Sequence, residues 1–284
     1  MIRPILQDES FISDVERART LPEHFHLWWL GQSGFLLQWE DRHLLFDPYL
    51  SDSLTKKYAT TDKPHVRMTE RVVAPEKLNF IDVVTSSHNH TDHLDAETLL
   101  ALMRMNPKID VVIPEANREF VTNRLQTAAE LPIGLDAGKH ATVKGFKISA
   151  VPAAHESIEK DAGGRCKYLG YVVEFGGWTV YHSGDTVRYP GMGETLRQWQ
   201  IDVAILPING AKPERRVAGN LDAREAAELG ADIRARCVIP CHYEMFEFNT
   251  SSPTEFVLHA KRLGVNYRVV LAGERWSSRE LPRR

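Results

Sequence analysis

The sequence contains little cysteine, and none of it has a spacing typical of metal or redox sites. Cys166, Cys237 and Cys241 are odd in number and include no C-x-x-C pair. This pattern argues against a disulfide framework. Because thiols stay reduced in the cytoplasm, we expect a cytoplasmic protein.

Other absences narrow the class of protein further. The N-terminus reaches Asp8 and Glu9 before any long apolar run, so it does not resemble a signal peptide. No stretch approaches the roughly 18 apolar residues that cross a bilayer, so we expect no membrane span. The net charge is −3 and long basic runs are lacking, so binding to nucleic acid is not expected. A G-x-S-x-G elbow is also missing, so nothing indicates a serine nucleophile.

The sequence does contain enough apolar material for a large core. Apolar residues make up 43% of its 284 residues, which allows one large α/β or sandwich domain. We expect a single domain over residues 1–284. Its ends would be a polar or helical lead-in over residues 1–20 and a loose, charged tail over residues 277–284.

The densest group of chemically active side chains is an H-x-H-x-D-H run made of His88, His90, Asp92 and His93. The β-branched residues 81–86 before it predict a strand. The apolar stripe in residues 97–105 after it predicts a helix, with Asp95 as its N-cap. The cluster is therefore expected on a loop between two regular elements, where binding and catalytic residues are common.

Imidazole and carboxylate are ligands that zinc, manganese and iron share. A structural zinc site would be expected to use cysteines and close its coordination shell, and this cluster has none. The run therefore favours an open, catalytic metal site over a polar loop that carries three unrelated histidines.

The remaining sequence alternates between strand pairs and strand–helix units. Apolar alternation and turn residues predict strands at residues 25–30, 35–39, 43–46, 109–113, 141–143, 146–153, 168–175, 178–182, 201–207, 237–240 and 267–271. Helices are predicted at residues 116–129, 194–200 and 222–233 and from residue 252, with Phe120 facing inward. Because the two halves are alike in kind, we expect an αββα sandwich of two mixed sheets with helices on its outer faces.

Four further polar residues follow predicted strands and are candidates for a site. His155, Asp185 and His242 each come directly after or near the end of a strand, as does Asp47, which could orient a ligand histidine from behind. Each also has a simpler interpretation, as a turn-forming aspartate or a buried histidine.

Two polar segments remain open in function. Residues 51–79 lack clear periodicity and form either a lid or a solvated excursion. The loop that carries Lys212, Arg215 and Arg216 could hold a phosphate or carboxylate of a substrate, or could simply be solvated.

The ordered set His88-x-His90-x-Asp92-His93, His155, Asp185 in Ser-Gly-Asp-Thr, and His242 resembles the ligand set of the metallo-β-lactamase superfamily. The resemblance spans roughly residues 25–275. Residues 25–31, 181–185 and 201–204 further resemble the L-ascorbate-6-phosphate lactonase branch. Ser87-His88-Asn89-His90 also looks like the branch of phospholipase D enzymes that hydrolyse N-acylphosphatidylethanolamine.

This resemblance implies a fold and a set of roles. It implies the metallo-β-lactamase fold, with His88, His90 and His155 binding one metal. Asp92, His93 and His242 would bind the other, with Asp185 bridging and His182 behind the site. The metals would be zinc or manganese, with iron a further candidate and a single-ion site left open.

Two cations held close together would lower the pKa of a shared water, which could then attack a carbonyl carbon or a phosphorus. Asp92 would hold that nucleophile and move a proton. We expect a hydrolase that opens a lactone of a phosphorylated sugar acid. The alternatives are a phosphodiesterase of the phospholipase D kind and a metal-binding protein without turnover. The substrate would be a small molecule, and the lactonase resemblance makes a homo-oligomer plausible.

Overall fold

The computed structural model describes residues 1–283, and its first sheet grows from a meander of closely spaced apolar strands. The strands of this sheet, in spatial order, are β13 (Arg275–Ser277), β1 (Phe25–Gly31), β2 (Gly34–Trp39), β3 (Arg42–Phe46), β4 (Val83–Thr85), β5 (Asp110–Pro114) and β6 (Ile133–Leu135). The pairs β13–β1–β2–β3 are antiparallel, and β3–β4–β5–β6 are parallel.

The second sheet repeats this mixture of hairpins and parallel strands. In spatial order it consists of β12 (Cys237–Cys241), β11 (Val203–Pro207), β10 (Trp178–His182), β9 (Leu169–Phe175), β8 (Phe146–Pro152) and β7 (His140–Val143). The strands β10, β11 and β12 run parallel. Strand β11 is buried along its whole length, as expected for a parallel strand covered on both faces.

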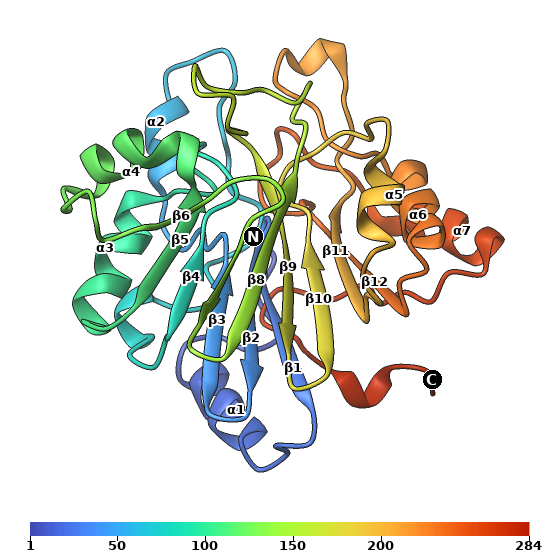
Figure 1. The fold of residues 1–284 in the computed structure, drawn as a ribbon, viewed down its shortest axis with the longest axis horizontal. Coiled ribbons are helices and arrows are strands. Elements are labelled where there is room, and N and C mark those ends of the chain that lie inside the picture. The colour runs from blue at the N-terminus through green and yellow to red at the C-terminus, as the bar shows by residue number, and fades with distance from the viewer. Residues whose placement is uncertain (284) are drawn as a thin grey trace.

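Helices cover the outer faces of the two sheets, which gives the predicted αββα sandwich (Figure 1). The α-helices are α1 (Glu9–Ala18), α2 (Ser53–Tyr58), α3 (Ala96–Met105), α4 (Arg118–Leu125), α5 (Met192–Leu196), α6 (Ala223–Asp232) and α7 (Pro253–Leu263). Figure 1 shows α3 and α4 beside the first sheet and α5, α6 and α7 beside the second. None of the helices within residues 1–283 is long and apolar enough to cross a membrane.

Side-chain caps fix the beginnings of α3 and α6. Asp95 accepts a hydrogen bond from the Thr98 backbone N–H and so caps α3, as the sequence predicts. Asp222 and Glu225 form a reciprocal capping box at the start of α6. The Asp95 cap also determines where the His88–His93 loop ends.

The two sheets meet through aromatic side chains. Phe25 of β1 lies 5.3 Å from both Phe175 of β9 and Trp178 of β10, measured between ring centroids. Trp39 of β2 lies 5.7 Å from Phe175. Each such pair contributes about 0.5–1.5 kcal/mol beyond the area it buries, so these rings hold the two layers in register.

Several local predictions were wrong. Residues 51–79, where no regular element was predicted, contain α2 and the 3₁₀ turn η1 (Pro75–Lys77). Residues 267–271 form a single bridge from Tyr267 to Val238 rather than a strand. Phe120 is 42% exposed instead of facing inward.

The C-terminal segment also differs from the loose tail that we expected over residues 277–284. Ser277 pairs with His26 as the end of β13, and Ser278 is buried at the start of the 3₁₀ turn η4 (Ser278–Glu280). The Ser278 hydroxyl accepts a hydrogen bond from the Phe25 backbone N–H. Residue 284 of the expected tail lies outside the described residues.

Candidate metal centre

Loops at one edge of the sandwich bring the predicted histidines and carboxylates together. The run 88–93 follows β4, and His155, Asp185 and His242 follow β8, β10 and β12. The strands β10, β11 and β12 are parallel, so their carboxyl ends open at a common edge, where sites in open α/β sheets are usually found. The separate signals along the sequence therefore converge on one site.

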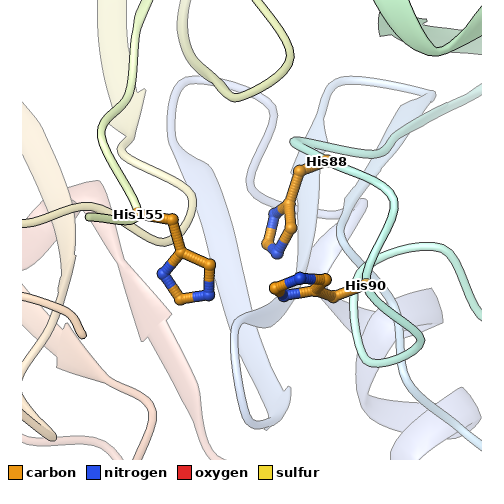
Figure 2. Close-up of side chains that lie close together, drawn as sticks. All are labelled: His88, His90 and His155. Atoms are coloured by element: carbon orange, nitrogen blue, oxygen red, sulfur yellow. The ribbon is translucent and has the colours of Figure 1, made fainter. Parts of the chain in front are cut away.

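The first group of possible metal ligands consists of His88, His90 and His155. One ring nitrogen from each lies within 4.8 Å of the others. Figure 2 shows the three rings pointing toward one another from two loops. The His155 Nδ1–H donates to the Gly219 carbonyl at 2.9 Å, which leaves the Nε2 lone pair free to face the site.

The second group consists of Asp92, His93 and His242, whose ligand atoms also lie within 4.8 Å of one another. Asp185 lies between the two groups. Its Oδ2 is 3.3 Å from His93 Nε2, 3.5 Å from His242 Nε2 and 3.7 Å from His155 Nε2. Its position allows one carboxylate to serve both groups.

Asp47 orients the histidine loop from behind. Its Oδ2 lies 2.7 Å from His93 Nδ1, and its Oδ1 accepts a hydrogen bond from the Ser87 backbone N–H. Asp47 is also close enough to His88 and His93 to form a third possible ligand group. Because it faces His93 Nδ1 while Nε2 faces Asp185, we infer that Asp47 orients His93 rather than binding a cation.

His182 lies behind the site, inside the sandwich. Its ring stacks on Phe46 with the centroids 5.0 Å apart, and its Nε2 lies 2.8 Å from the Ser33 carbonyl oxygen. Burial lowers the pKa of His182, so the ring is neutral and donates to that carbonyl. These contacts give it a packing role.

Charge is distributed unevenly over the cluster. Burial, followed by the nearby His93, lowers the pKa of His88 well below its usual value. Burial also opposes a charge on His93, but Asp185 and Asp92 outweigh it and raise the His93 pKa well above its usual value. Burial likewise opposes a charge on Asp185, yet His93 and His242 lower its pKa well below the usual range. The protein is thus arranged to stabilise positive charge between its two carboxylates.

The residues present fit divalent cations. His88 Nε2, His93 Nε2 and Asp185 Oδ1 are buried without a hydrogen-bond partner among the described residues. Buried polar atoms are normally satisfied, so each such atom needs an explanation. A cation bound by nitrogen and oxygen donors would satisfy them, and this donor set suits zinc, manganese and iron alike.

Gln32 also belongs to the site although it was not predicted, and it lies in the turn between β1 and β2. Its side chain is buried, and its Nε2 lies 2.9 Å from Asp92 Oδ2 and 3.0 Å from His242 Nε2. Only a turn could be predicted for residues 31–34, because no local pattern marks a turn residue that reaches a distant site.

A cavity of about 640 Å³ opens onto the cluster. Its wall includes Asp92, Asp185, His155 and His242, together with Tyr58, Phe120 and Tyr168. The cations in this wall are Lys57, Lys63 and Arg124.

The predicted basic residues are not part of the cavity wall. Arg215 donates to the carbonyls of Asn209 and Thr250, Arg216 pairs with Asp62, and Lys212 is exposed. Arg215 therefore holds its own loop and Arg216 contacts the 51–79 segment, and the role of the three as substrate contacts stays a prediction.

The chain is similar to known families over most of its length. A family model described as the beta-lactamase superfamily domain matches residues 42–243. A metal-dependent hydrolase from Methanosarcina mazei is 31% identical over 80% of this chain and 87% of its own. A metal-dependent hydrolase from Opitutus terrae is 31% identical over 87% of this chain and 97% of its own.

Solved structures support the same fold. Igni18, a metallo hydrolase from Ignicoccus hospitalis, has a TM-score of 0.65 at 23% identity and covers 89% of this chain and 98% of its own. The isothiocyanate hydrolase from Delia radicum gut bacteria has a TM-score of 0.68 at 19% identity over 88% of this chain and 98% of its own. At these identities the likeness concerns the fold alone.

Proposed function

The chain belongs to the metallo-β-lactamase superfamily and is a metal-dependent hydrolase of it, and we propose that it hydrolyses a lactone that carries an acidic group. One observation carries the proposal. Six possible ligands lie around Asp185 in two groups of three, and four of them line the same cavity as Asp185. The resemblance to the L-ascorbate-6-phosphate lactonase branch supports the choice of bond.

We assign His88, His90 and His155 to one cation and Asp92, His93 and His242 to a second, with Asp185 shared. Such cations, zinc or manganese, would lower the pKa of a water and polarise the substrate oxygen. Asp47 and the Gly219 carbonyl fix the tautomers of His93 and His155. Asp92 is half-buried and lies in the cavity wall, so it would hold the attacking water and accept its proton.

The cavity cations favour an acidic substrate. Arg124 lies 4.4 Å from the Phe120 ring centroid, and its Nη1 donates to the carbonyls of Asn89 and Leu94. These bonds use at most two of the five N–H groups of the Arg124 guanidinium. No carboxylate within residues 1–283 forms an ion pair with Arg124. Lys57 lies in the wall nearby, with its ammonium 3.5 Å from Thr91 Oγ1. We propose that Arg124 and Lys57 attract the acidic group.

The test is a substrate panel with added metal. We expect hydrolysis of an acidic lactone, and slower hydrolysis of a neutral lactone of the same ring size. Lys57→Met should raise KM for the acidic lactone about 3- to 10-fold with little change for the neutral one, because it removes the charge that attracts the acid and keeps an unbranched side chain at this exposed position beside Tyr58. Arg224→Met, which lies on the outer face of α6 and pairs with Glu228, is the matched control.

Two other functions predict different results in the same panel. A phosphodiesterase of the phospholipase D kind would cleave bis(p-nitrophenyl) phosphate and spare both lactones. A metal-binding protein without turnover would keep its metal and cleave nothing.

We further propose a homo-oligomer in the cytoplasm. The three cysteines, all free and buried, fit a reducing compartment.

A further inference from the structure

Gln32 approaches only the second of the two ligand groups. Its Nε2 lies 2.9 Å from Asp92 Oδ2 and 3.0 Å from His242 Nε2, and those two atoms are 3.9 Å apart. A carboxylate only accepts hydrogen bonds, so the amide nitrogen, not its oxygen, must face Asp92. The two N–H bonds of one amide group can therefore be directed to two atoms that would otherwise bind a cation.

The amide and a cation compete for the single lone pair of His242 Nε2. His242 Nε2 accepts from Gln32 only when it carries its lone pair, which is also the form that binds a metal. Asp92 Oδ2 has two lone pairs and could accept from the amide while it binds a cation, so the competition lies at His242 Nε2. A cation at Asp92, His93 and His242 therefore requires the Gln32 amide to turn away.

Among the described residues, no side-chain amide donates to the metal-facing atoms of the first group. His88 Nε2 has no hydrogen-bond partner among the described residues, and the bond made by His155 uses Nδ1, the nitrogen that faces away from Asp185. A cation bound by His88, His90 and His155 has no protein donor to displace. Each group offers three ligands, but only the second one has an amide donor close to its ligand atoms.

The backbone of Gln32 is fixed, so only its side chain can respond. Its carbonyl accepts hydrogen bonds from the Trp29 indole N–H and from the His242 backbone N–H, both at 3.0 Å. Its φ of 51° lies in the left-handed region and is held by this turn. The same residue thus anchors the His242 loop through its backbone and faces His242 Nε2 through its side chain.

We propose that Gln32 makes metal loading sequential: the His88–His90–His155 group binds a cation first, and the Asp92–His93–His242 group binds a second, more weakly, after its amide is displaced. This inference rests on the proposed metal site, but not on the identity of the substrate. Gln32 would thereby control whether the centre holds one metal ion or two at a given metal concentration.

The test is a titration of chelator-treated protein with Zn²⁺, followed by calorimetry and by metal analysis after desalting. In the wild-type protein we expect two binding steps separated by at least about tenfold in Kd. Gln32→Ala should tighten the second step about tenfold and leave the first within about twofold, because a hydrogen bond to a charged group is worth roughly that factor. Gln32→Glu should tighten it further, since it replaces the donor with a negatively charged ligand.

Ser33→Ala is the matched control, since Ser33 is the next residue in the turn and its hydroxyl lies beside the Cys241 thiol rather than beside a metal ligand. Its two steps should equal those of the wild-type protein. A Gln32→Ala protein whose second step is unchanged or weaker would overturn the inference while leaving the metal centre intact. A wild-type protein that binds no Zn²⁺ would instead overturn the proposed function itself.

Discussion

At the scale of single residues, the site depends on groups that orient the metal-facing atoms. Asp47 and the Gly219 carbonyl each hold the far nitrogen of a histidine, at 2.7 Å and 2.9 Å. The sequence predicts Asp47, His155, Asp185 and His242, because each stands near the end of an apolar strand. It does not predict Gln32, Lys57 or Arg124, because their places depend on how separate loops pack over the cavity.

Replacing Asp47 tests its orienting role at this scale. Asp47→Asn should weaken metal binding about 10- to 100-fold, since the partners behind ligand histidines usually contribute that much. The change should be measured as competition with a chromophoric chelator. Asp110→Asn alters a half-buried carboxylate that pairs with Lys144, far from the site, and should have no effect. Equal affinities for Asp47→Asn and wild-type protein would mean that Asp47 serves only packing.

At the scale of elements, close contacts between loops place the ligands. Asp185 follows Gly184, whose φ is 59°, and a Cβ at Gly184 would lie 2.6 Å from the Ser87 Cβ. The turn after β10 therefore packs directly against the start of the histidine run. Strand ends were predictable from apolar runs, but this contact joins residues about 100 positions apart and leaves no pattern in the sequence.

A pair of glycine variants separates the contact from the backbone strain. Gly191 has a φ of 82° with nothing within 4 Å of an added Cβ, so Gly191→Ala should cost only the conformational penalty of about 1–2 kcal/mol. Gly184→Ala should cost about 1–3 kcal/mol more and also weaken metal binding, because it pushes Asp185 away from His93. Thermal unfolding and the chelator assay measure both effects. Similar losses in the two variants would contradict the packing role.

At the scale of the whole molecule, two sheets and their outer helices could be predicted because apolar periodicity and caps are local signals. Residues 51–79 and the C-terminal segment could not. Helix α2 packs through Leu54 into a small cluster with Tyr49 and Phe246, and β13 pairs with β1 across the whole chain. Such long-range partners, rather than local propensity, order these segments.

Stability against acid provides a test of the packed sandwich. Burial, with Arg19 nearby, lowers the pKa of His43 to about 3 from 6.5. Below pH 6.5 the unfolded chain therefore takes up a proton that the folded chain excludes, so stability falls as pH falls toward about 3. This difference in proton uptake lowers the free energy of unfolding by about 2 kcal/mol at pH 5.

Replacing His43 should remove that part of the pH dependence. We expect the free energy of unfolding of His43→Leu to fall about 2 kcal/mol less than that of the wild-type protein between pH 8 and pH 5. Urea denaturation at the two pH values gives this difference, and pH 8 serves as the internal reference because His43 is then neutral in both states. Parallel pH profiles would show that His43 is protonated inside the folded protein.

The most direct test of the central claim is the metal content of the purified protein, measured together with hydrolysis, for wild-type, His90→Ala and His140→Ala proteins. His140 is exposed on β7 and controls for the loss of a histidine. We predict up to two equivalents of metal in wild-type and His140→Ala proteins, and loss of metal together with at least about 100-fold of the activity in folded His90→Ala. Activity that survives in His90→Ala protein without metal would contradict the account.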